Sequence, residues 1–163
     1  MLKFSTLIAC GVILDVSIGK EGLNMERNTV LQPFLSHLAS DRQICTQLLG
    51  NIMAGKSDKT TKQGVVNFWR NNLQKHIEAE EKTLIPFLVQ HRFNQQYINL
   101  LYREHNTIRV LAERLPEGPE GDYLYEAFVK LVHEHLMFED KVIFTQIQEK
   151  IPPRELEQLR QVA

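Results

Sequence analysis

Histidine and glutamate occur twice in this sequence at a spacing of four residues. His76 precedes Glu80, and His135 precedes Glu139. Residues four apart lie one turn apart on the same face of a helix, so each pair can direct a nitrogen and a carboxylate oxygen to one point. Two such pairs that face each other inside a helical protein would suit iron or manganese.

Two further histidines extend the pattern. His37 and His105 each lie in the middle of a mainly apolar stripe on two other predicted helices. At a rise of about 1.5 Å per residue, antiparallel helices would bring the four histidines to one level. We therefore predict a centre of two metal ions. Its predicted ligands are His37, His76, Glu80, His105, His135 and Glu139.

The predicted metals are two iron ions, because ligation rich in imidazole favours iron, with manganese as the alternative. Six side chains do not saturate two octahedral ions. An oxo or hydroxo bridge, or a small exogenous ligand, is therefore expected to complete the coordination.

The alternative is a structural bundle whose histidines are hydrogen-bonded core residues. A lone histidine on an apolar stripe is more often of that kind. Glutamate on such a stripe is rarer, because burying an unpaired carboxylate is costly. The joint occurrence of four stripe histidines and two correctly spaced glutamates favours the metal site.

The polar residues near the predicted ligands either have two possible roles or are expected to face solvent. Asp41 either orients a ligand imidazole or pairs with Arg109. Glu81 and Asp140 are expected on solvated faces. The two remaining histidines are expected to be surface residues: His133 points away from His135 on its helix, and His91 lies at a predicted turn.

From Met25 onward the sequence predicts helix almost throughout. Breaks are expected at 54–58, 90–94 and 116–121, and Pro152 with Pro153 should end the last helix. Four long helices with short connections predict an all-α, antiparallel up-and-down four-helix bundle. Residues 76–85 resemble residues 135–144, which indicates two related helical hairpins.

Length, charge and cysteines limit the remaining classes. The 163 residues suit one working domain, 25–163, preceded by an N-terminal extension of unclear role, 1–24. The extension is too short and too interrupted for a membrane span. A net charge of −1 without a basic stripe argues against nucleic acid. Cys10 and Cys45 form no paired spacing, which fits a reducing, cytoplasmic setting.

At these ligand positions the sequence resembles the hemerythrin-like family, named for its His-His-Glu cation-binding pattern. The resemblance covers roughly residues 25–151 and implies a di-iron centre within a helical bundle. The pattern of the oxygen-carrying members places a fifth histidine where this chain has Arg109, and would make Asp140, rather than Glu139, the last carboxylate. The pattern of four histidines and two glutamates is closer to the di-iron domain of the repair-of-iron-centres proteins, which implies bridging by Glu80 and Glu139.

The resemblance implies a function in nitrosative or oxidative stress, or in the repair of iron centres. The expected ligand is nitric oxide, peroxide or oxygen, and a redox partner protein is an option. The alternative is a reversible oxygen or iron carrier or sensor without turnover. Whether the protein is an enzyme, a di-iron oxidoreductase, stays open at this point.

Overall fold

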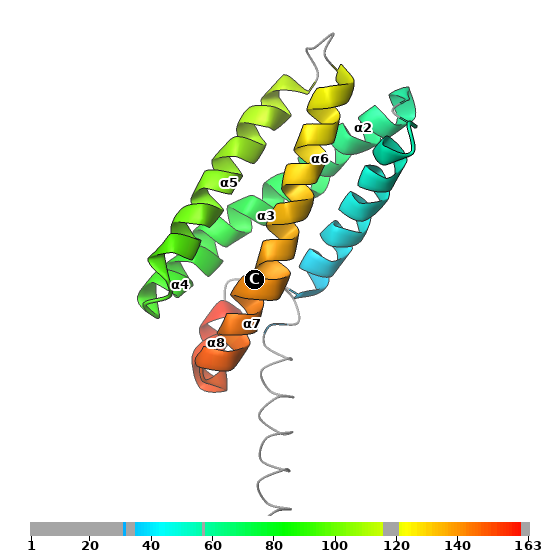
Figure 1. Ribbon diagram of the computed structural model, residues 1–163. Helices are drawn as coiled ribbons and strands as arrows, with labels where there is room; N and C mark the ends of the chain where they lie inside the picture. The colour runs from blue at the N-terminus through cyan, green and yellow to red at the C-terminus, as the bar shows by residue number, and fades with distance from the viewer. Residues whose placement is uncertain (1–30, 32–34, 57, 116–120, 161–163) are drawn as a thin grey trace, which may run out of the picture.

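The computed structural model describes residues 31, 35–56, 58–115 and 121–160, and the predicted extension 1–24 lies outside them (Figure 1). The described residues form helices and contain no strand, which confirms the all-α class. None of their helices combines the length and the apolar character needed to cross a bilayer.

Four long helical stretches and one short helix make up the described chain. The first stretch covers residues 35–53. The second consists of α2 (Lys59–Phe68), η1 (Trp69–Leu73), α3 (Gln74–Ala79), η2 (Glu80–Leu84) and α4 (Ile85–Gln90). The third is α5 (Gln95–Arg114). The fourth consists of α6 (Gly121–Phe138), η3 (Glu139–Ile143) and α7 (Phe144–Lys150), and the short helix is α8 (Pro153–Arg160).

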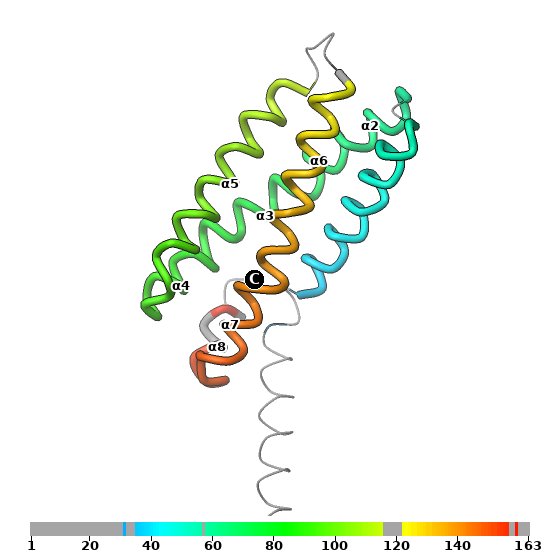
Figure 2. Tube along the Cα trace, viewed as in Figure 1, coloured from blue at the N-terminus to red at the C-terminus, as the bar shows by residue number. Residues whose placement is uncertain are grey.

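The long stretches lie side by side (Figures 1 and 2). Two of the predicted breaks are confirmed by capped helix starts. The Asp58 carboxylate accepts from the backbone N–H of Thr61 at 2.8 Å, and the Asn94 side chain accepts from that of Gln96 at 2.9 Å. Most of the third break, 116–120, lies outside the described residues.

The prediction that Pro152 and Pro153 end the last helix is only half correct. Helix α7 does end at Lys150, but Pro153 then begins α8. Proline is tolerated in the first turn of a helix, where its missing N–H would have no partner within the helix. The part of the chain that the structure describes therefore has one more helix than the four that the sequence predicts.

Apolar side chains from every long stretch form the core that holds the polar site in place. Leu73, Ile77, Leu101, Ile108 and Leu136 are each fully buried. Trp69 meets the buried Phe128 edge to face, with ring centroids 6.3 Å apart. The second, third and fourth stretches are thereby packed against one another.

The first stretch is rotated relative to the predicted stripe. The prediction places His37 on the inner face, but its side chain is exposed and that of its neighbour Leu38 is buried instead. Asp41 is buried as predicted. Burying the apolar Leu38 leaves its neighbour His37, 100° further round the helix, exposed to solvent.

Candidate metal centre

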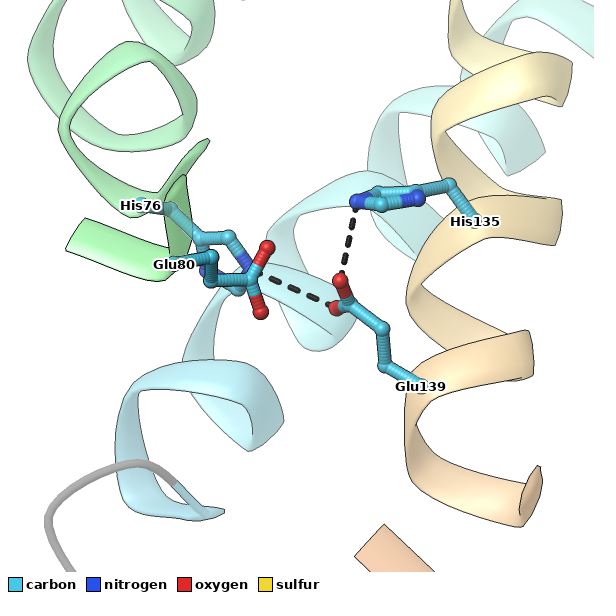
Figure 3. Close-up of side chains that lie close together, drawn as sticks. All are labelled: His76, Glu80, His135 and Glu139. Carbon is cyan, nitrogen blue, oxygen red and sulfur yellow. Dashed lines mark hydrogen bonds and ion pairs between the residues drawn. The ribbon is translucent and has the colours of Figure 1, made fainter. Parts of the chain in front are cut away.

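Four of the predicted ligands converge in the interior. His76 comes from α3, Glu80 begins η2, His135 lies near the end of α6 and Glu139 begins η3. One ligand atom from each lies within 4.8 Å of one ligand atom of every other (Figure 3). This is the cluster that the two His-x-x-x-Glu spacings predict.

His105 joins this cluster from α5. Its Nε2 lies 3.3 Å from Glu80 Oε2, and its ring meets that of His135 with centroids 4.9 Å apart. Five of the six predicted ligands are thus brought together. His37 is not, because its side chain is exposed on the first stretch.

The two inner carboxylates each divide their oxygens between different histidines. Glu80 turns Oε1 toward His76 Nε2 at 3.3 Å and Oε2 toward His105. Glu139 turns Oε2 toward His76 Nε2 at 3.3 Å and Oε1 toward His135 Nε2 at 3.0 Å. Each carboxylate therefore lies between His76 on one side and His105 or His135 on the other, which is how a bridging carboxylate would lie between two ions.

Four inward-facing atoms have no hydrogen-bond partner among the described residues. They are Glu80 Oε2, His105 Nε2, His135 Nε2 and Glu139 Oε1. They face one another only as ion pairs, at 3.3 Å for Glu80 and His105 and at 3.0 Å for Glu139 and His135. Buried polar atoms nearly always have hydrogen bonds, so four without one in one place need an explanation. All four are nitrogen or oxygen donors of the kind that bind iron or manganese, and the donor set therefore fits a cation.

Each clustered imidazole also carries an outer carboxylate on Nδ1. The partners are Asp41 for His76 at 3.0 Å, Glu81 for His105 at 3.0 Å, and Glu104 for His135 at 2.9 Å. A carboxylate accepts, so Nδ1–H donates in every case. The ring is thereby fixed with Nε2 pointing inward, as in metal sites where a carboxylate orients a ligand histidine.

The sequence does not predict the roles of two of these outer carboxylates, Glu81 and Glu104. Glu81 was expected on a solvated face, but it contacts His105. Arg109 was considered as a partner of Asp41, but it donates to Glu81 through two nitrogens at 2.9 and 2.7 Å. Glu104 was not singled out, and its only signal is its position next to His105. Asp41 orients an imidazole, as one of its two readings proposed.

The structure separates the rival carboxylates Glu139 and Asp140. Glu139 is fully buried and faces the histidines. Asp140 pairs with Arg42 of the first stretch and remains about one-third exposed. In this arrangement Glu139 has the position of a ligand, and Asp140 does not.

The remaining histidines lie away from the cluster. His133 is half-buried rather than fully exposed. The expectation that His91 is solvated is wrong. Its ring packs on Phe87 with centroids 4.1 Å apart, and its Nε2 lies 3.2 Å from a carboxylate oxygen of Glu155 in α8.

The histidines and glutamates of the cluster shift one another's pKa values toward their charged forms. Burial favours neutral His135, but Glu139 and Glu104 outweigh it and raise the pKa of its imidazole to about 10. Burial opposes protonation of His76 as well, yet Glu80, Asp41 and Glu139 raise its pKa well above the ordinary value. The pKa of Glu139 is lowered, because His135 and His76 outweigh its burial. Without metal, protons on His76 and His135 thus balance the buried charge of Glu139, and a cation can take their place.

The backbone widens at both inner glutamates. The five-residue π-helical turns η2 and η3 begin at Glu80 and Glu139. π-Helical turns are rare and occur frequently at functional sites. The same irregularity occurs at both repeats, and a third π-helical turn, η1, lies just before His76 in the same helical stretch.

Comparison with known families gives one match. The description Hemerythrin HHE cation binding domain matches residues 36–147, which is more than half of the chain and includes every clustered residue. Comparisons with curated proteins and with solved structures give no match.

Proposed function

This chain belongs to the hemerythrin HHE cation-binding domain family, and we propose that it holds two iron ions between its helices. The proposed ligands are His76, Glu80, His105, His135 and Glu139. The observation that supports the proposal is the set of four buried donor atoms that have no hydrogen-bond partner among the described residues and face one another only as ion pairs. Manganese is the alternative metal.

Two finer points belong to the same proposal. The four long helical stretches form an antiparallel up-and-down four-helix bundle, and α8 is a short additional helix after the fourth stretch. His37, which the sequence predicts as a sixth ligand, is outside the proposed set because it is exposed. Its role as a ligand stays a prediction.

The proposed activity is reaction with nitric oxide, peroxide or oxygen in a cytoplasmic stress response or in the repair of iron centres. A ferrous pair supplies electrons and a site for a small ligand. The residues of this chain hold the imidazoles in orientation and keep the inner carboxylates buried. In support, Arg109 stands where the oxygen-carrier pattern has a fifth histidine, so the ligand set differs from that of a simple carrier.

Iron content and the absorption spectrum after anaerobic reconstitution test the metal proposal. We expect two irons per chain, and the same value for His133→Ala as a control. A chain that retains no iron would refute the proposal and leave the histidines as core residues.

Mixing the ferrous protein with nitric oxide, peroxide and oxygen tests the activity. Consumption of peroxide, or conversion of nitric oxide to nitrous oxide, is the expected result. A stable adduct that releases oxygen on evacuation would instead show reversible carriage.

A further inference from the structure

The two ion positions implied by the divided carboxylates are unequal. On one side, His105 and His135 join one oxygen each from Glu80 and Glu139. On the other side, His76 alone joins the two remaining oxygens. The first position therefore offers two imidazole nitrogens and the second only one.

The hydrogen bonds of the donor atoms also differ between the two positions, and they too favour binding of an ion at the first. The four atoms without a hydrogen-bond partner among the described residues are the four donors of the first position. At the second position, His76 Nε2 already bonds to Glu139 Oε2. The four atoms face one another as two ion pairs without hydrogen bonds, at 3.3 Å for Glu80 and His105 and at 3.0 Å for Glu139 and His135, so an ion between them supplies contacts that the protein alone does not complete.

Burial adds a third difference. The side chains of His105, His135 and Glu139 have no exposed surface, whereas that of His76 is 8% exposed. The sixth ligand that the sequence predicts, His37, is exposed on the first stretch and adds no donor here. The second position is thus closer to solvent and has fewer donors from the described chain.

The compact group of His76, Glu80, His135 and Glu139 does not contradict this division. The bond from His76 to Glu139 itself draws these residues together in the absence of metal. The four atoms without a hydrogen bond are the better guide to where the first ion binds, because their only protein contacts are the ion pairs that they make with one another.

We propose that the two ions bind in order, the first tightly between His105, His135, Glu80 and Glu139, and the second weakly beside His76. This inference rests on the proposed function and deepens it. The second ion exchanges with solution while the first is retained. The chain accordingly has a stable form with one ion and a complete form with two.

The test is an anaerobic titration of the metal-free, full-length chain with ferrous iron, followed by calorimetry and by metal analysis after desalting. We expect two steps that differ in affinity by about tenfold or more, and one iron retained after exposure to a weak chelator. His76→Ala should keep the tight step and lose the weak one. His105→Ala and His135→Ala should weaken the tight step by at least the 10–100-fold that is typical when a partner that orients a ligand is lost.

His133→Ala is the matched control, since it removes a histidine two residues from His135 and should leave both steps unchanged. Circular dichroism melting of each metal-free variant shows whether it is folded. The inference is overturned if the folded His76→Ala variant loses both steps, or if the natural chain takes two ions in one step of equal affinity. A natural chain that binds no iron at all would refute the proposed function instead.

Discussion

The two His-x-x-x-Glu units have nearly the same inner structure but different outer partners. Both place an imidazole and a buried glutamate in the cluster, and both continue into a π-helical turn. The acid that follows differs: Glu81 contacts His105 and Arg109, whereas Asp140 pairs with Arg42 away from the cluster. The repeat spacing fixes the inward residues, and the neighbouring helix decides what the next residue does.

Substitution of the inner glutamates, Glu80 and Glu139, should give the largest loss of iron. It should also show whether the two His-x-x-x-Glu units contribute equally to metal binding. Glu80→Gln and Glu139→Gln keep the side-chain shape but remove the negative charge that a bridging ligand supplies. We expect iron content to fall from two per chain to well below that value in both variants. Metal analysis after reconstitution measures it, and loss in only one variant would break the equivalence of the two units.

The acids that follow them should give a smaller and unequal effect. Glu81→Gln weakens the orientation of His105, so we expect metal affinity to fall by about 10–100-fold. Asp140→Asn breaks a partly exposed pair with Arg42, and such pairs contribute about 0–1 kcal/mol, so metal affinity should be unchanged.

Titration of both variants with ferrous iron makes this comparison directly. Arg109→Ala adds a third measurement, because it leaves Glu81 in place but removes the two hydrogen bonds that hold it. Its effect should lie between the other two. A larger loss for Asp140→Asn than for Glu81→Gln would restore Asp140 as the ligand.

Residue types and spacing were enough to predict the inner site. His and Glu four apart share a face on any regular helix, so the units at His76 and His135 needed no knowledge of packing. The capped breaks at Asp58 and Asn94 were likewise local, because each depends on one side chain and the next turn. The helical class and the convergence of His76, Glu80, His135 and Glu139 follow from such local rules.

The outer partners could not be predicted, because they depend on how one helix is rotated against another. Glu81 and Asp140 have the same position in the repeat, and only the residues opposite them, Arg109 and Arg42, distinguish them. His37 was misplaced for a related reason. His37 and Leu38 are neighbours in the chain, so their side chains point 100° apart around the helix axis. The apolar Leu38 side chain is buried in the core, and the His37 side chain is therefore exposed.

The thermal stability of the metal-free chain should depend on pH through the paired charges of His135 and Glu139, the second His-x-x-x-Glu unit. The pKa of His135 is raised from 6.5 to about 10, so its contribution to stability is complete below about pH 6.5 and is lost as pH rises through about 10. The pKa of Glu139 is lowered, so its contribution is present above 4.5 and is lost only in strong acid. The midpoint of thermal unfolding should therefore fall as the solution becomes alkaline.

Thermal melts between neutral pH and about pH 10.5, with chelator and with bound metal, measure this. Bound metal takes the place of the protons and should flatten the alkaline decline. Glu139→Gln removes the partner that raises the pKa and should flatten it in the metal-free chain as well. An equal decline in that variant would assign the effect to the first unit, where the pKa of His76 is also raised.

The smallest expected effect belongs to the first helical stretch, which faces the His76 unit. His37 is exposed, whereas Asp41, one turn later, bonds to His76 Nδ1. His37→Ala should leave both binding steps unchanged within about twofold, and Asp41→Asn should weaken only the second, because His76 supplies that position. If His37→Ala instead removes the second ion, the first stretch must turn inward when metal binds. The His76 unit would then gain its second imidazole from a residue that the metal-free chain exposes.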